Sequence, residues 1–130
     1  MQPLAADLQA EDMRELAEYY AGLTPPQVQS KPFDPALVER GRKLAVEGLP
    51  GAGVPPCITC HSPGTPNPRL DGQHDAYMAR QLRLRKIGFG PSTENSALMT
   101  PIAQKLSDDD INALSAYFAR RPVREAQHPD

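Results

Sequence analysis

Hydrophobic side chains recur at spacings of three and four residues in four separate stretches of this 130-residue chain. This period is that of an amphipathic α-helix, whose apolar face packs against a core while its polar face meets water. No stretch alternates cleanly between apolar and polar side chains over five or more residues, and residues 49–68 are rich in Pro and Gly. The pattern predicts an all-α fold with long loops. Its helices are expected over residues 10–21, 34–48, 74–87 and 107–121.

Local signals at the helix ends support the same assignment. Asp34 can cap the second helix, and Pro35 stands at its first position, where a missing N–H costs little. Ser107 opens the fourth helix as an N-cap, with Asp110 placed to complete a capping box. Gly41 lies on the apolar face of the second helix. We expect this glycine to allow another helix to approach closely.

The chain divides by its pattern into four segments. We expect an N-terminal helix over 1–22, a linker over 23–33, the main domain over 34–121 and a loose tail over 122–130. Residues 1–21 also resemble residues 99–119: with Met1 left out, seven of the remaining 20 aligned positions are identical. Because these identities include the apolar face of the helix, we interpret them as a duplication. The chain would then begin with a copy of the helix that ends its main domain.

The overall composition argues against several classes of protein. The formal net charge is −2, whereas proteins that neutralise many nucleic-acid phosphates are basic. No apolar run reaches the roughly 18 residues that predict a membrane span. The N-terminus lacks the basic and apolar regions of a secretory signal. Aromatic residues make up only 5% and Trp is absent, so a bulky cofactor could supply apolar volume that the core lacks.

The candidate chemistry lies in the pentapeptide Cys57-Ile58-Thr59-Cys60-His61. The pattern Cys-x-x-Cys-His is typical of the attachment of a c-type haem. One helical turn brings both sulfurs to one side, where they can form thioethers with the two haem vinyl groups. The next residue then lies beneath the iron as its proximal ligand. The motif therefore predicts one covalently attached haem c, held by Cys57, Cys60 and His61.

Three other functions of the cysteine pair compete with this one: a redox dithiol, a disulfide and half of a zinc site. A thioredoxin-like dithiol would need a βαβ pattern around the motif, which is missing. Zinc would need two more ligands, and the only other histidines are His74 and His128. A zinc- or disulfide-stapled module would also be colourless.

The sixth coordination position of the iron either takes a second donor or stays open. The available donors are Met13, Met78, Met99 and His74. Met13 and Met78 lie on helix faces, where core packing is the simpler explanation. Met99 falls within residues 95–101, which we expect to be irregular and so able to aim a side chain inward. We predict His61 and Met99 as axial ligands, a pair that raises the reduction potential and leaves electron transfer as the function.

These residues resemble the class I cytochromes c, most closely one domain of the periplasmic two-haem cytochromes of the c-four type. The resemblance covers roughly residues 31–121. It includes the haem motif and the run Pro68-Arg69-Leu70-Asp71-Gly72-Gln73, which is similar to the family's pattern Pro-x-Leu-Ala-Gly-Gln. Its further elements are Tyr77 with Gln81-Leu82, Met99 before Leu106-Ser107-Asp108, and Ala113-Leu114-Ser115-Ala116-Tyr117.

The resemblance implies several roles for single residues. It implies that the carbonyl of Pro68 accepts a hydrogen bond from the ring of His61, which fixes the ring and raises its basicity. It places Gln73 and Tyr77 among the haem-binding residues. It also implies two such domains in tandem, with residues 1–21 as the end of a first domain.

The chain departs from the family pattern at several positions. The family usually has Gly after the haem His and a longer Gly-rich loop. Here Ser62 follows, and the loop is short and Pro-rich, so Pro66 could provide the carbonyl instead of Pro68. The family tends to have an aromatic residue where Arg85 stands and a basic one where Gly90 stands. We therefore expect the contacts to the haem propionates to differ.

The sequence predicts a monohaem carrier that shuttles single electrons between redox proteins and catalyses no reaction of its own. The alternative is the haem domain of a larger oxidoreductase, such as a dehydrogenase, an oxidase or a sulfur-compound-oxidising enzyme. Because the family receives its haem outside the cytoplasm, we expect a periplasmic bacterial protein whose signal peptide or upstream domain is not part of this chain. We expect the N-terminal helix to contact an adjoining cytochrome domain or a second copy in a homodimer.

Charge is distributed unevenly along the chain. Residues 69–86 carry five basic and two acidic side chains, a local charge of +3, whereas residues 1–24 carry five acidic and one basic, a local charge of −4. A solvated helix face would explain the basic residues. Alternatively, they attract an acidic partner, and salt should then slow the encounter.

Overall fold

The computed structural model describes residues 5–23, 32–90 and 94–122 of the chain. Within these ranges the backbone forms helices and loops, and an isolated bridge between Leu49 and Val54 is the one β-type pairing. The expected all-α class is confirmed. The chain falls into two units, one with α2 (Ala10–Ala21) and one with the helices from α3 to α7, and each is described by itself.

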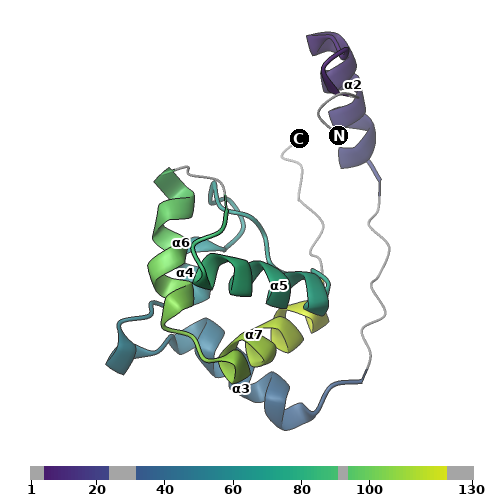
Figure 1. The fold of residues 1–130 in the computed structure, drawn as a ribbon. Coiled ribbons are helices and arrows are strands. Elements are labelled where there is room, and N and C mark those ends of the chain that lie inside the picture. Colours follow the sequence, from purple (N-terminus) through teal and green to yellow (C-terminus); the bar gives the residue numbers. More distant parts are fainter. Residues whose placement is uncertain (1–4, 24–31, 91–93, 123–130) are drawn as a thin grey trace. The chain divides into compact units, whose positions relative to one another are not determined.

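The larger unit contains long helices joined by loops and short turns (Figure 1). Its elements are α3 (Pro35–Glu47), the 3-10 turn η1 (Pro50–Ala52), α4 (Cys57–Cys60), α5 (Asp75–Lys86), α6 (Glu94–Gln104) and α7 (Asp108–Arg120). With α2, the helices α3, α5 and α7 confirm all four stretches predicted from the hydrophobic pattern. Among the described helices none is both long and apolar enough to cross a membrane.

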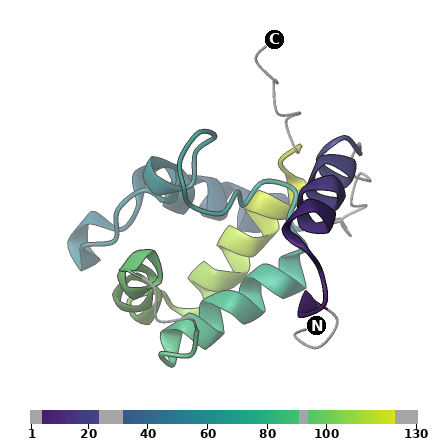
Figure 2. The same cartoon turned by 90° about the horizontal axis from the view of Figure 1, so that it is seen from above.

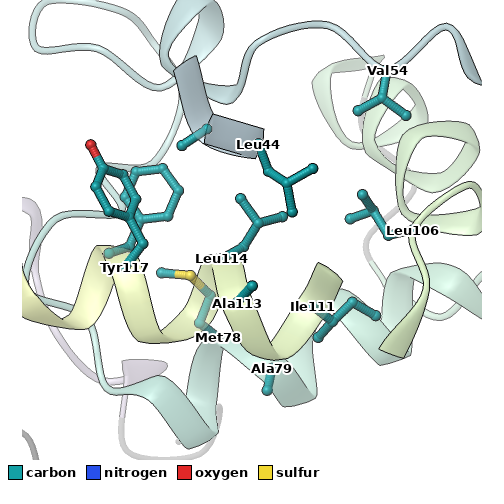
Figure 3. Close-up of a cluster of buried hydrophobic side chains, with 11 residues drawn as sticks. Leu44, Val54, Met78, Ala79, Leu106, Ile111, Ala113, Leu114 and Tyr117 are labelled. Carbon is teal, nitrogen blue, oxygen red and sulfur yellow. The ribbon is translucent and has the colours of Figure 1, made fainter. Parts of the chain in front are cut away.

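Helix α7 lies between α3 and α5 and forms the centre of the core (Figures 1 and 2). The four apolar side chains predicted for its buried face, Ile111, Leu114, Tyr117 and Phe118, are all buried. Leu44 from α3 and Met78 from α5 join the same cluster (Figure 3). Full burial of a side chain of this size stabilises the fold by about 1.5–3 kcal/mol. Met78 is only 5% exposed, which confirms its interpretation as a core residue.

The helix caps form as the sequence predicts. The Asp34 carboxylate accepts a hydrogen bond of 2.9 Å from the backbone N–H of Ala36. At the start of α7, the Ser107 hydroxyl accepts from the Asp110 N–H at 3.1 Å, and the Asp110 carboxylate accepts from the Ser107 N–H at 3.0 Å. Arg40 on α3 also donates to Asp110, at 2.8 Å. Burial raises the pKa of the Asp110 carboxyl, but the hydrogen bonds from Ser107 and Arg40 outweigh this effect and hold that pKa below its ordinary value.

Helix α2 has the predicted bounds and carries its apolar side chains on its surface. The backbone N–H of Gln9 donates a hydrogen bond of 2.9 Å to the Asp12 carboxylate, which satisfies a donor at the start of the helix. No residue of α2 is buried, and its apolar side chains are 43–67% exposed. These side chains are Met13, Leu16, Tyr19 and Tyr20. An exposed group of this kind is typical of an interaction surface.

Gly41 permits the close crossing of α3 and α7, as expected. A Cβ atom at this position would lie 2.0 Å from the carbonyl oxygen of Ala113 and 2.7 Å from Cβ of Tyr117. The first of these is a backbone atom of α7, so a side-chain rotation cannot relieve the clash. The two helices can therefore meet at this distance only with glycine at position 41.

The exchange Gly41→Ala should destabilise the domain. Forcing extra atoms into a packed interface typically costs about 1–3 kcal/mol, and the backbone clash puts this site at or above the upper end. Ala gains about 1 kcal/mol over Gly in helix propensity, so we expect a net loss of about 2 kcal/mol or more in the free energy of unfolding. Denaturant titration measures this loss.

Gly51→Ala serves as the matched control, because a Cβ there meets no atom within 4 Å. This variant should unfold within about 0.5 kcal/mol of the parent. Equal stability of the two variants would show that α3 and α7 do not depend on the glycine contact.

Candidate functional site

The two cysteines lie on the single turn of α4, which packs against α3. Pro56 precedes this turn at its N-cap and His61 follows it at the C-cap, where the His61 N–H donates to the Cys57 carbonyl at 3.0 Å. Both thiols are free. The structure thus places Cys57, Cys60 and His61 on one turn of backbone, as the motif predicts.

The environment of Cys57 disfavours thiolate chemistry. Burial raises the pKa of the Cys57 thiol to about 11. A reactive dithiol instead needs a cysteine whose thiolate is readily formed. Across residues 5–23, 32–90 and 94–122, no group of three or more His, Cys, Asp and Glu side chains gathers that could hold a metal ion. The local chemistry therefore favours neither a redox dithiol nor a structural zinc site.

The ring of His61 is held in one orientation by the backbone. Its Nδ1 atom lies 2.7 Å from the carbonyl oxygen of Pro68. A carbonyl can only accept, so Nδ1 carries the proton and donates, which leaves Nε2 with its lone pair available to a metal. Of the two prolines considered from the sequence, Pro68 rather than Pro66 makes this contact.

Polar side chains of the loop after His61 bind the end of α4. Thr65 Oγ1 donates to the Cys60 carbonyl at 2.6 Å, and Asn67 Nδ2 donates to the same oxygen at 2.9 Å. The Ser62 hydroxyl donates to the carbonyl of Ile58. These bonds satisfy carbonyls that the end of a helix leaves unpaired. These bonds were not predicted from the sequence, although Ser, Thr and Asn just after a helix are a recognisable signal for them.

The expectation that residues 95–101 are irregular is wrong. They lie within α6, which runs through Pro101. A proline inside a helix removes one N–H and usually kinks or ends the helix, but the residues after it are held by packing: Ala103 is fully buried and Ile102 packs against the core. Met99 is therefore a partly buried residue of a helix that contacts α5.

Gln73 and Tyr77 lie at the beginning of α5. The side-chain oxygen of Gln73 accepts a hydrogen bond of 2.9 Å from the backbone N–H of His74, the N-cap of that helix. Tyr77 is 50% exposed. The ring of His61 thus contacts the Pro68 carbonyl directly, whereas the side chain of Gln73 binds the backbone at the start of α5.

The departures from the family pattern at Arg85 and Gly90 are coupled in space. A Cβ at Gly90 would lie 2.4 Å from Nη1 of Arg85. The guanidinium of Arg85 thus occupies the space that a side chain at position 90 would need. A positive charge is still present beside position 90, supplied from α5.

No family model matches the chain. Among curated proteins it is 39% identical over 114 residues to cytochrome c4 of Azotobacter vinelandii. The aligned segment covers 83% of this chain and 53% of that protein. It is 33% identical over 130 residues to the thiosulfate dehydrogenase electron acceptor of Stutzerimonas stutzeri strain A1501, over 96% of this chain and 60% of that protein. It is 37% identical over 70 residues to cytochrome c-554(548) of Halomonas halodenitrificans, over 48% of this chain and 81% of that protein.

Solved structures show the same likeness. The crystal structure of reduced cytochrome c4 from Pseudomonas stutzeri superposes with a TM-score of 0.74 at 33% identity, over 92% of this chain and 64% of that one. Thiosulfate dehydrogenase from Marichromatium purpuratum superposes with a TM-score of 0.77 at 34% identity, over 98% of this chain and 28% of that one. The chain thus spans a little more than half the length of the cytochrome c4 relative from Azotobacter vinelandii.

An all-α fold with a Cys-x-x-Cys-His turn and an oriented histidine defines a c-type haem protein. The chain belongs to the cytochromes c of class I, and its relatives include the two-domain cytochromes c4. This confirms the resemblance inferred from the sequence.

The residues present fit haem c, the cofactor of this family. Two free thiols and a histidine with an available Nε2 lie within one turn of backbone. Apolar side chains from four different segments pack against the core yet stay partly exposed: Cys57, Leu70, Leu82 and Ile102. Such surface suits a large apolar group, and the low aromatic content of 5% leaves room for one.

Proposed function

We propose that this chain is an electron-transfer module that passes single electrons between redox proteins through one His/Met-ligated haem c. The observation that carries the proposal is the hydrogen bond of His61 to Pro68, which leaves Nε2 free directly after two free thiols. When bound, the haem supplies a one-electron couple at its iron. Cys57 and Cys60 anchor it, and His61 provides one axial ligand. The Pro68 carbonyl holds the ring of that ligand and raises its basicity.

Met99 is proposed as the second axial ligand, with Gln73 and Tyr77 as further haem-binding residues. Of the two methionines in the larger unit, Met78 is buried in the core, whereas Met99 is only partly buried on α6 and so has a surface that a haem could contact. A thioether ligand favours ferrous iron and so raises the reduction potential. With both axial positions filled, small molecules are kept from the iron.

The exchange Met99→Ala should keep the covalent haem but abolish the sulfur-to-iron charge-transfer absorption of the ferric protein and lower its reduction potential. Met78→Ala is the control. It should cost about 2–5 kcal/mol in stability, as a core cavity does, and keep that absorption. Spectroscopy and potentiometry of both variants test the assignment. Loss of the absorption in Met78→Ala and its retention in Met99→Ala would refute it.

The second candidate function is a haem domain within a larger oxidoreductase. The chain superposes over 98% of its length on part of a thiosulfate dehydrogenase, and a relative is named as the electron acceptor of such an enzyme. In this case the domain would receive or deliver electrons inside an assembly. An enzyme site on this iron would need an open axial position, and carbon monoxide binding at neutral pH would reveal one.

The periplasm is the proposed location, in a bacterium. The proposal rests on the covalent haem, because the family receives its haem outside the cytoplasm. Fusion of the chain to an exported signal, followed by haem staining of periplasmic and cytoplasmic fractions, tests where attachment takes place.

A basic partner-binding surface on α5 remains a proposal, and the contacts of its side chains reduce the number of cations that face solvent alone. Arg83 donates to Asn112 at 2.9 Å and lies 3.3 Å from Asp108, and Lys86 donates to the Leu106 carbonyl at 2.7 Å. These two cations also serve the fold. Arg80 is exposed on the same helix, so it is the residue whose charge is best tested for attraction of a partner.

Electron transfer to the anionic oxidant ferricyanide should slow as salt rises, because the local charge of +3 over residues 69–86 attracts anions and salt screens this attraction. The exchange Arg80→Gln should weaken the salt dependence, whereas the control Arg42→Gln on α3 should not. Stopped-flow rates of ferricyanide reduction from low to high ionic strength measure this salt dependence. A rate that rises with salt, as the net charge of −2 alone would produce, contradicts the proposal.

We further propose that α2 packs against an adjoining cytochrome domain or a second copy of the chain, through residues that include Met13, Leu16 and Tyr20. An isolated helix of 12 residues is marginal in water. Its apolar face thus needs a partner. The likeness of residues 1–21 to the helix that ends the main domain supports an adjoining cytochrome domain.

Deletion of residues 1–22 should leave the haem spectrum intact while it lowers the melting temperature or removes a dimer. Each kcal/mol lost lowers the melting temperature of a domain of this size by about 4–8 °C. Light scattering and thermal unfolding of the full and shortened chains measure the two effects. If the full and shortened chains have the same oligomeric state and the same melting temperature, a packing role for α2 is rejected.

A further inference from the structure

An ion pair outside the Cys-x-x-Cys-His turn connects the loop of Pro68 to the end of α7. Arg121 Nε lies 2.6 Å from Asp71 Oδ1. The other side of the same guanidinium donates to the hydroxyl of Tyr117 at 2.7 Å, and its carbon lies 5.5 Å from the centre of that ring. The side chain of Asp71 is 15% exposed and that of Arg121 39%. The Nε atom itself is buried and makes no hydrogen bond among the described residues, so its ion pair with Asp71 is the interaction that offsets its burial.

The backbone beside this pair is fixed to the same helix. The N–H of Gly72 donates to the Phe118 carbonyl at 2.9 Å, and the side chain of Leu70 packs against the core. At the other end of the loop, Asn67 is bound to the Cys60 carbonyl at 2.9 Å. Pro68 therefore lies on a short segment that is anchored to α4 before it and to α7 after it.

The position of the Pro68 carbonyl matters because it receives the ring N–H of His61. Hydrogen bonds weaken as distance and angle depart from the optimum, and this segment has no helix or strand of its own to keep it in place. The family pattern that the segment resembles has Ala where this chain has Asp71.

We propose that Asp71 and Arg121 are a positioning pair that holds the Pro68 carbonyl on His61 and thereby sets the basicity of this ligand. The inference rests on the proposed function of His61 as an iron ligand. A firm hydrogen bond to Nδ1 raises the electron donation of the ring, which favours ferric iron and lowers the reduction potential. Loss of the pair should loosen that bond and raise the potential.

The experiment compares Asp71→Asn and Arg121→Gln with the double variant and with a matched control. Arg40→Gln is the control, because it breaks another partly buried pair to α7, with Asp110 at 2.8 Å, that has no link to the Pro68 loop. Three quantities are measured on the haem-loaded chain: the reduction potential, the rate at which the Nδ1 proton of His61 exchanges with solvent, and the free energy of unfolding.

In Asp71→Asn and Arg121→Gln, the exchange rate should rise by about tenfold, which corresponds to about 1.4 kcal/mol, and the potential should increase. In potential and exchange rate, the double variant should change no further than either single variant, because both remove the same ion pair. Stability can fall further in Arg121→Gln, because Arg121 also donates to the hydroxyl of Tyr117. Arg40→Gln should lose stability with neither of the other effects.

Unchanged potential and exchange in both single variants would overturn the proposal. So would equal changes in Arg40→Gln, which would show a general loss of stability, or additive changes in the double variant. The proposed function fails separately, and first, if the parent chain takes up no haem. Variants that carry haem at the parent potential refute the positioning pair alone.

Discussion

The close contact between the backbones of α3 and α7 at Gly41 is the constraint on which the larger unit depends. It lets α7 lie deep between α3 and α5, so that one face of α7 can bury Ile111, Leu114 and Phe118 together. The pair between Arg40 and Asp110 spans the same interface near the start of α7. Burial of apolar area supplies the stability, and the glycine makes the geometry of that burial accessible.

This frame supports the haem site from two sides. Helix α3 contacts the one-turn helix that carries both cysteines. Helix α7 anchors the segment after Pro68 through the Phe118 carbonyl and Arg121. The hydrogen bond between His61 and Pro68 joins the two sides, so the orientation of the histidine depends on packing well away from the cysteines.

Local sequence signals predicted most of the fold. Helices α2, α3, α5 and α7 follow from hydrophobic period and capping residues, and the Cys-x-x-Cys-His motif identifies the site without any structure. Helix α6 was not predicted, because it runs through Pro101 and is held by tertiary packing of Ala103 that no local pattern shows. The pair of Asp71 and Arg121 joins residues far apart in sequence. Its partners could be matched only once α7 and the loop were placed in space.

The central claim is that Cys57 and Cys60 anchor one haem c on this chain. Mass spectrometry after unfolding measures this directly when the chain is produced together with the haem-attachment machinery. We expect a mass increase of one haem per chain that survives denaturation, and none in the variant Cys57→Ser/Cys60→Ser. A parent chain with the mass of the bare polypeptide would contradict this claim.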